Sequence, residues 1–272
     1  MKYYRDIQDF QRWLYRQNLS INSIKTYVGC IERFLEYSVP ISKQGLLGYK
    51  DKLLDKYNPR TVNVNIIAIN KYLDYCDLNE YALTQVKLQQ KPSIDNVISR
   101  MEYKLFKKKL KEEGDLKAYF LIKFLGMTGA RVSEVVQIRI EDLDRGYTQI
   151  LGKGHKLRRL LFPESLRLET LHWARTLGKR KGFLFVNGNE EPLTTRGVAY
   201  IIKKFATKYE MDLKVIYPHS FRHRFAQNFI EKYPNIALLA DILGHSSIET
   251  TRIYLRKSQQ EQQYLINKLV TW

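Results

Sequence analysis

Three short stretches near the end of the chain read Pro218-His219-Ser220-Phe221-Arg222-His223, Leu243-Gly244-His245 and Thr250-Thr251-Arg252-Ile253-Tyr254. A fourth, Thr128-Gly129-Ala130-Arg131-Val132-Ser133-Glu134, lies near the middle, and Glu134 is the one carboxylate within the four. Guanidinium groups are permanently charged and their planar fork matches a phosphate, so they can take the place of metal ions in phosphoryl transfer. The pattern therefore predicts a tyrosine nucleophile that acts on a phosphodiester held by Arg131 and Arg222.

The tyrosine that closes the last stretch, Tyr254, is one of 19 in the chain. Its position after Leu-Gly-His, and not its residue type, selects it. A free tyrosine has a pKa of about 10 and is a weak nucleophile at neutral pH, so flanking cations would help by favouring the phenolate. Tyr233 and Tyr264 are the alternative nucleophiles. His219 and Arg222 lie three residues apart, so both can face the same site from one helix.

The order and spacing of the four stretches resemble the tyrosine recombinase family, which contains phage integrases and Xer-like proteins. The resemblance extends from about residue 5 to the end of the chain. It implies a mainly α fold with a small β-sheet, in which an N-terminal helical bundle (core-binding, SAM-like) precedes a mixed α/β catalytic domain. It also implies a site-specific DNA recombinase that cleaves and rejoins strands through a covalent 3′-phosphotyrosine. The catalytic residues that it implies are Arg131, Lys153, His219, Arg222, His245 and Tyr254.

The resemblance assigns expected roles to several of these side chains. Lys153, in Gly152-Lys153-Gly154, is expected to be the general acid that protonates the departing 5′ oxygen; the alternative is a turn lysine that only touches DNA. His219 is expected to accept the tyrosine proton, or to return it during ligation. His245 is expected to donate a hydrogen bond to a phosphate oxygen.

Other residues near these stretches are expected to support the site. Glu134 would orient a catalytic side chain, and His223 would pack behind the site. The residues expected to contact the DNA backbone are Lys156, Arg158 and Arg224. A zinc site built from His219, His223 and His245 is an alternative, because two histidines four residues apart can share a metal. The charge of Arg222 between the first two argues against it.

Composition points to a polyanionic partner independently of the motifs. The chain has 46 Lys and Arg against 28 Asp and Glu, a net charge of +18, and the excess is spread over both halves. Such an excess of basic residues indicates a polyanionic partner such as nucleic acid. The alternative is a charged surface that only keeps the protein soluble. No phosphate-binding Gly-x-x-x-x-Gly-Lys-Ser/Thr loop is present. We therefore expect no requirement for ATP and, because Arg131 and Arg222 can take the place of metal ions, no metal and no cofactor.

A length of 272 residues and a polar, Pro-containing linker at residues 89–95 predict two domains, residues 1–90 and 91–272. Helices are expected in the first domain after a Ser20 cap and on both sides of the Asn58-Pro59 breaker. The remaining segments expected to be helical are residues 7–14, 46–57, 62–76, 101–113, 116–127, 194–209 and from 219 onward. The segments expected to be strands are residues 147–151, 158–162 and 183–186, with a turn at 152–156 between the first two.

The expected partners are double-stranded DNA recombination sites and further copies of the chain. By resemblance, a homo-oligomer forms on DNA, a tetramer in the synapse, with residues 258–272 docking on a neighbouring protomer; the alternative is a tail packed on its own domain. Met1–Asp9 has no signal-peptide character. Cys30 and Cys76 lie in apolar helical patterns and favour a reducing cytoplasm, where association with the nucleoid is expected.

Two other functions remain open at the level of sequence. A type IB topoisomerase-like enzyme shares the chemistry but relaxes DNA without strand exchange. A DNA-binding protein without activity is the third class, and the complete catalytic set argues against it. No apolar segment reaches the ~20 residues that a membrane helix needs, so no membrane association is expected. An additional module before the helical bundle, as in larger integrases, is not expected either.

Overall fold

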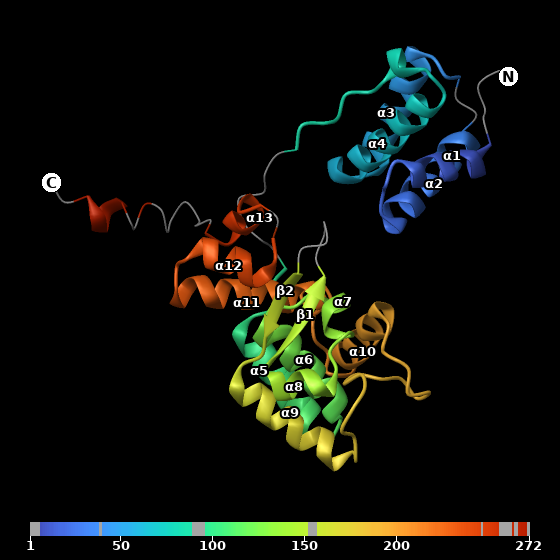
Figure 1. Cartoon of the computed structure of the whole chain (residues 1–272). Helices are drawn as coiled ribbons and strands as arrows, with labels where there is room; N and C mark the ends of the chain where they lie inside the picture. The colour runs from blue at the N-terminus through green and yellow to red at the C-terminus, as the bar shows by residue number, and fades with distance from the viewer. Residues whose placement is uncertain are drawn as a thin grey trace. The chain divides into compact units, whose positions relative to one another are not determined.

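The structure is a computed structural model that describes residues 6–37, 40–88, 96–151, 157–245, 247–255, 263 and 266–270. The chain divides into two compact units, residues 1–90 and 91–272 (Figure 1), and each unit has its own hydrophobic core. The mainly helical fold with one small sheet confirms the predicted fold class. Within the described part of the chain, no helix is long and apolar enough to cross a membrane.

Unit 1 is a bundle of four helices, as predicted. They are α1 (Ile7–Arg16), α2 (Ile21–Glu36), α3 (Lys43–Lys56) and α4 (Pro59–Tyr75). Ser20, Ser42 and Asn58 each accept a hydrogen bond from the backbone N–H three residues ahead, and such a cap satisfies one of the free donors of a helix start. Pro59 occupies the first turn of α4, where its missing N–H costs nothing.

After α4, a short 3-10 helix, η1 (Asn79–Tyr81), leads into an extended segment that lies along unit 1. Asn70 exchanges two hydrogen bonds of 2.9 Å with the backbone of Leu83. Asn63 exchanges two more with the backbone of Val86, at 2.9 and 2.7 Å. These paired bonds hold the chain on the bundle up to the start of the predicted linker at residue 89.

Unit 2 is built around α6 (Leu116–Thr128), which is buried on nearly all sides. It packs against α5 (Arg100–Glu112), α9 (Glu164–Thr176) and α11 (Pro218–Lys232). The other helices of this unit are α7 (Val132–Val135), α8 (Ile140–Arg145), α10 (Thr195–Lys208), α12 (Ile236–Leu243), α13 (Glu249–Arg252) and the 3-10 helix η2 (Ile253–Leu255). The helices from α11 onward lie next to the sheet at one end of the unit (Figure 1).

The sheet consists of two antiparallel strands, β1 (Tyr147–Leu151) and β2 (Leu157–Leu161), in a register that pairs Tyr147 with Leu161 and Leu151 with Leu157. The turn between them lies outside the described residues.

The prediction of a third strand at residues 183–186 is wrong. Phe183 forms an isolated bridge with Arg139, and Val186 forms another with Pro192. The two ends of the segment pair with different partners, so no continuous ladder can form. Pro192 also lacks the N–H that a ladder would need.

Candidate active site

Arg131 is placed by the turn that follows α6. Gly129 ends that helix in the left-handed conformation, with φ of 63°, and a side chain there would collide with Phe225. Only glycine enters this conformation without strain. Arg131 directly precedes α7. The carboxylate of Glu134, on α7, accepts hydrogen bonds from the backbone N–H of Arg131 at 2.7 Å and from the Arg131 guanidinium at 2.9 Å. The guanidinium is thereby held with 39% of the side chain still exposed.

Arg222 lies on α11 and is almost completely buried, at 1% exposure. Its guanidinium donates to the carbonyl oxygens of Gly129 at 2.8 Å and Leu243 at 2.7 Å. Its Nε has no hydrogen-bond partner among the described residues. Burial and the nearby charge of Arg131 lower the pKa of Arg222 to about 10. Burying a charge is costly unless it has partners, and the two carbonyl oxygens supply them for this cation.

The end of α12 gathers three guanidinium groups on three successive carbonyl oxygens. Arg158 donates to Ile242 at 2.6 Å, Arg222 to Leu243 at 2.7 Å and Arg131 to Gly244 at 3.1 Å. Carbonyls at a helix C-terminus carry partial negative charge and favour cations. A side chain at Gly244 would collide with Arg158, and Gly244 itself is left-handed, so only glycine allows this close approach.

His245 follows that helix end and is held by two hydrogen bonds. Its Nε2 lies 2.9 Å from the Arg222 guanidinium, and its Nδ1 lies 2.7 Å from the Thr251 hydroxyl. A guanidinium can only donate, so Nε2 must accept and Nδ1 must carry the proton toward Thr251. Burial and the charge of Arg222 lower the pKa of His245 to about 4. The ring is therefore neutral, and in this arrangement it accepts a bond instead of donating one to a phosphate.

Tyr254 lies on η2, where its ring packs with Ala226, Leu239 and Leu243 between α11 and α12. Its hydroxyl is 2.7 Å from Nδ1 of His223. Burial raises the pKa of Tyr254 to about 12, although the charge of Arg222 opposes the rise.

His219 stands edge-on to His223, one turn earlier on α11, with ring centroids 4.5 Å apart. Burial and the charges of Arg222 and Arg131 lower the pKa of His219. The structure thus brings together five of the six sequence-predicted catalytic residues.

The charge of this cluster is positive overall. Glu134 is the carboxylate shared by Arg131 and Arg158, at 2.9 and 2.7 Å. Burial alone would raise the pKa of Glu134, but hydrogen bonds from the Arg131 backbone and from both guanidinium groups outweigh it, so the pKa is lowered. With Arg222 included, the cluster contains three cationic side chains and one carboxylate. Such a site suits an anion that gains negative charge during a reaction.

The remaining predicted residues have different surroundings. Lys153 and Lys156 lie outside the described residues. Arg158 is only 14% exposed and its guanidinium contacts Glu134 and α12, which differs from the exposed position expected of a DNA-backbone contact. Arg224 donates to the Ile98 carbonyl at 2.5 Å and ties α11 to the start of α5.

The structure describes one of the two alternative nucleophiles, and it can be searched for the alternative metal site. Tyr233 is half-exposed, at 54%, and makes no hydrogen bond to the cluster; Tyr264 is outside the described part of the chain. Within that described part, no group of three His, Cys, Asp or Glu side chains is arranged to hold a metal ion.

Thr251 is a site residue that sequence reasoning missed. It is fully buried, and its hydroxyl accepts the hydrogen bond from Nδ1–H of His245, the tautomer that Arg222 imposes. Its place six residues after that histidine, inside the motif that selects Tyr254, was the available signal.

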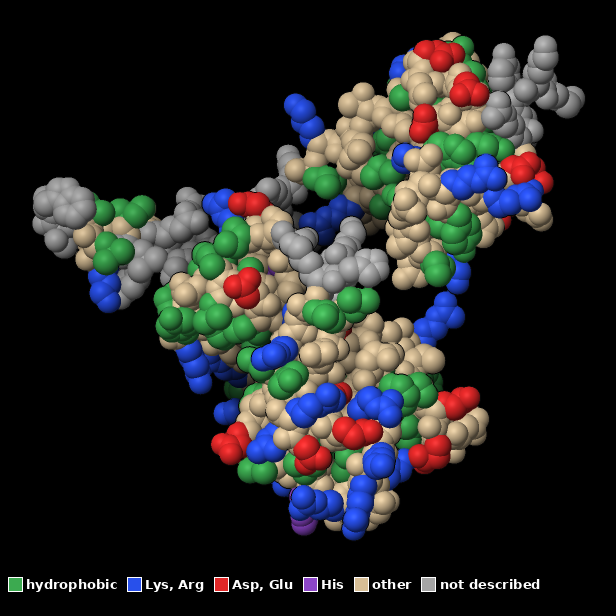
Figure 2. Space-filling model, viewed as in Figure 1, with side chains coloured by type: hydrophobic (Ala, Val, Ile, Leu, Met, Phe, Trp, Pro, Cys, Tyr) green, Lys and Arg blue, Asp and Glu red, His purple; other side chains and the backbone are tan. Residues whose placement is uncertain are grey.

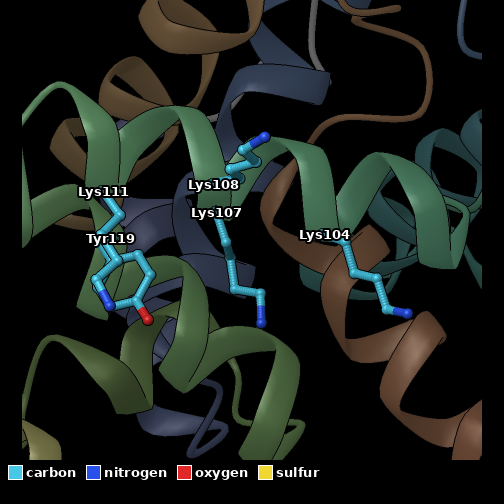
Figure 3. Close-up of a pocket in the computed structure, with 5 residues that line it drawn as sticks. All are labelled: Lys104, Lys107, Lys108, Lys111 and Tyr119. Atoms are coloured by element: carbon cyan, nitrogen blue, oxygen red, sulfur yellow. The ribbon is translucent and has the colours of Figure 1, made fainter.

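A second cationic region lies on α5 and α6. Lysines 104, 107, 108 and 111 and Tyr119 line a hollow of about 270 Å³ (Figure 3). Lys107 lies 4.5 Å above the ring of Tyr103, and burial, followed by the charge of Lys123, lowers its pKa. Lys and Arg side chains are also spread over the visible faces of both units (Figure 2). The cationic character is therefore not confined to the arginine and histidine cluster.

Comparison with known proteins agrees with this geometry. The sequence profile of the phage integrase family matches residues 96–261. Tyrosine recombinase XerA of Pyrococcus furiosus is 30% identical over 260 residues, which cover 92% of this chain and 88% of that protein. Tyrosine recombinase XerC of Pediococcus pentosaceus is 29% identical over 280 residues, covering 96% and 88%.

Solved structures share the fold. XerH site-specific recombinase bound to palindromic difH substrate, in a post-cleavage complex, has a TM-score of 0.74 at 22% identity and covers 97% of this chain and 85% of that one. A lambda integrase dimer bound to a COC′ core site has a TM-score of 0.73 at 12% identity, covering 93% and 94%. The site and fold define an enzyme of DNA strand transfer, and the chain belongs to the phage integrase family. It is a tyrosine site-specific recombinase, which confirms the predicted resemblance.

Proposed function

We propose that Tyr254 attacks the scissile phosphate of a DNA recombination site and forms a 3′-phosphotyrosine that a second strand later resolves. The observation that carries this proposal is the partly buried Tyr254 hydroxyl, which lies within the field of the buried cation Arg222. Replacing the hydroxyl should therefore abolish the covalent step while leaving DNA binding intact. Tyr254→Phe on a nicked suicide substrate tests this, with Tyr233→Phe as the matched control. A denaturation-resistant adduct formed by Tyr254→Phe would overturn the assignment.

In this proposal, Arg131 and Arg222 bind the non-bridging oxygens of the phosphate. The net positive charge around Glu134 supports this role, because the transition state places additional charge on those oxygens. Arg158 would act differently from the backbone contact expected from sequence: its bonds to Glu134 and Ile242 position Arg131 and α12. His245 would donate to a phosphate oxygen only after Nε2 leaves its bond with Arg222 and gains a proton.

Lys153 is proposed as the general acid for the departing 5′ oxygen. An alkoxide leaves poorly without a proton, so Lys153→Ala should slow cleavage by about 10²–10⁴. A thiol is far more acidic than an alcohol, with a pKa of about 8.5 for cysteine, so sulfur at the 5′ bridging position should restore the rate. Arg131→Ala is the control that sulfur should not rescue. If sulfur does not rescue Lys153→Ala, the lysine only contacts DNA. The salt dependence of DNA binding should then be weaker in Lys153→Ala than in wild type.

The guanidinium groups are proposed to do the work that divalent metals do in many nucleases. With saturating protein on the DNA substrate, cleavage in excess EDTA should then be as fast as cleavage without EDTA. Loss of cleavage that zinc or magnesium restores would instead favour a metal bound by the histidines.

The chain is proposed to act as a homo-oligomer, a tetramer in the synapse, on two DNA sites. Unit 1 would bind the core site, and unit 2 would carry out catalysis. Ile266, Leu269 and Val270 in the tail are exposed apolar residues, at 55%, 65% and 49%, which supports docking on a neighbouring protomer. Truncation after residue 258 should leave half-site binding intact and weaken cooperative binding to a full site. Unchanged cooperativity would show that the tail packs on its own unit.

A further inference from the structure

We propose that Ser220 and Arg224 are positioning residues for cleavage, because they fix the place of the helix that carries Arg222. The inference rests on the proposed function, in which Arg222 binds a non-bridging oxygen of the scissile phosphate. Both residues lie on α11, and both bond to the main chain of Ile98, just before α5 begins. Their effect on the reaction would therefore pass through Arg222.

The two side chains hold Ile98 by both of its backbone polar groups. The Ile98 N–H donates to the Ser220 hydroxyl at 2.7 Å, and the Ile98 carbonyl accepts from Nε of Arg224 at 2.5 Å. Residues four apart on a helix lie side by side, so one face of α11 makes both bonds. Ser220 and Ile98 are fully buried, where an unpaired polar group is costly. This pair of bonds, the Ile98 contact, is therefore a specific feature of the interior.

The Ile98 contact supplies directional bonds where the neighbouring contacts are apolar. The next residue of α11, Phe221, is buried and packs with the rings of Tyr103 and Phe106. Apolar burial is non-directional, whereas a hydrogen bond weakens steeply when its angle changes. Serine is also not a favoured residue inside a helix. We therefore infer that Ser220 serves to fix the rotation and the axial position of α11.

The catalytic side chains of α11 lie within one turn of the Ile98 contact. Arg222 points to other partners, the carbonyl oxygens of Gly129 at 2.8 Å and Leu243 at 2.7 Å. One short helical segment is thus bonded to the start of α5 on one face and to the active site on another. A rotation of that segment would displace the guanidinium of Arg222. A misplacement of about 1 Å can cost roughly 10²-fold in rate.

A third contact between α11 and the start of α5 provides a control. Arg100 donates to Asn228 at 2.8 Å and forms an ion pair with Glu231. The two charged side chains are about half exposed, and exposed ion pairs contribute little to stability. Asn228 and Glu231 also lie further along α11 from Arg222. Arg100→Gln should therefore leave the cleavage rate unchanged.

The first test separates positioning by Arg224 from the DNA contact that the sequence predicted for it. Arg224→Met keeps the apolar stem and removes the donor. Single-turnover cleavage of the nicked suicide substrate at saturating protein should slow by about 10–100-fold, while the salt dependence of DNA binding stays as in wild type. A wild-type rate at saturation, with a salt slope lower by about one ion, would make Arg224 a DNA contact and overturn the inference.

The second test compares two variants of Ser220. Ser220→Ala leaves the buried Ile98 N–H without its acceptor and should slow cleavage at least tenfold, with DNA affinity within twofold of wild type. Ser220→Thr keeps the hydroxyl and should retain most of the rate. Leu166→Ala, in the buried face of α9, should lower the melting temperature without lowering the rate of the folded protein. A similar rate loss in Leu166→Ala would assign the effect to general loss of stability and overturn the inference.

The third test asks whether the Ile98 contact acts through Arg222. Ser220→Ala should slow cleavage by a smaller factor in an Arg222→Ala background than in wild type, because the group that it positions is gone. Equal factors in the two backgrounds would overturn the inference. An adduct that survives Tyr254→Phe would instead refute the proposed function. Wild-type rates in Ser220→Ala and Arg224→Met, with the adduct on Tyr254, would refute only the inference, so the two failures are distinguishable.

Discussion

The cluster around Arg222 and the lysine hollow on α5 are both cationic, but their charges are held in opposite ways. Arg131, Arg158 and Arg222 are each fixed by backbone carbonyls or by Glu134. In the hollow, Lys108 has an ion pair with Glu112 at 3.6 Å, and Lys107 and Lys111 lie over aromatic rings at 4.5 and 5.9 Å. A rigid fork can stabilise one transition-state geometry, whereas flexible ammonium groups supply charge without fixed direction. The first region should govern rate, and the second at most affinity.

Among the variants that compare these two cationic regions, the largest effect is expected from Arg222→Ala. It should slow cleavage by about 10³, or roughly 4 kcal/mol, the upper range for one lost charged donor in an oxyanion site. Binding should weaken far less. Arg222→Lys is the matched variant, and it should be nearly as slow because one ammonium group cannot serve the Gly129 and Leu243 carbonyls together. Single-turnover adduct formation measures the rate, and a thermal melt confirms the fold. A wild-type rate in Arg222→Lys would remove the proposed difference between fixed and flexible cations.

The next effect concerns Glu134, which holds two of the arginines. Glu134→Gln should lower the free energy of unfolding at pH 7 by about 3 kcal/mol, since breaking a buried pair leaves an uncompensated charge. The pKa of Glu134 is lowered in the folded protein, so its contribution is complete above the unfolded value of about 4.3 and is lost as the pH falls below that value.

Urea titrations of wild type and Glu134→Gln, at pH 7 and again near pH 3, measure this contribution. The stability difference should shrink at the lower pH. A difference that is the same at both values would show that the Glu134 charge does not hold the arginines.

A smaller effect is expected at Thr251, whose hydroxyl accepts the hydrogen bond from Nδ1–H of His245. Thr251→Val keeps the shape but leaves the buried Nδ1–H without an acceptor, at a cost of about 1–3 kcal/mol. Cleavage should slow by about tenfold. Thr251→Ser keeps the hydroxyl and should retain most of the rate. If serine and valine behave alike, packing and not the hydrogen bond explains the role of Thr251.

The smallest effect is expected in the lysine hollow. The double variant Lys104→Gln and Lys108→Gln should leave cleavage at saturating protein unchanged. Its DNA affinity should fall no more than a few fold, and the salt slope of binding by at most about one ion for each lysine that touches phosphate. A matched pair on another helix, Lys203→Gln and Lys204→Gln, shows the effect of lowering the net charge elsewhere. A loss of rate as large as in Arg222→Ala would place the hollow in the catalytic machinery.

Local patterns predicted the helices of unit 1 well, because caps such as Ser20 and Asn58 and the apolar spacing act within one helix. They were less successful in unit 2. The helix α9 was not predicted, since its buried face includes Thr170 beside Leu166 and Trp173, which weakens the apolar period. The strand expected at 183–186 was wrong because its pairing depends on Arg139 and Pro192, which no local pattern reveals.

The sequence by itself predicted the chemical identity of the site, since the order and spacing of the motifs, and the resemblance that they carry, singled out Arg131, Arg222, His245 and Tyr254 before any contact was known. Tertiary structure alone decided how these groups are held and which one touches which. Arg158 was expected on DNA and lies against Glu134. His223 was expected behind the site and lies on the Tyr254 hydroxyl.

The physical reason is the range of the forces. A motif records which side chains a reaction needs, but hydrogen bonds and burial act over a few ångströms between residues that the fold brings together from distant parts of the chain. Tyr254 lies 31 positions after His223, and the bond between Arg158 and Ile242 spans 84. Such contacts arise only when α11, α12 and the hairpin pack, and the same packing lowers the pKa of His223 and His245 and raises that of Tyr254.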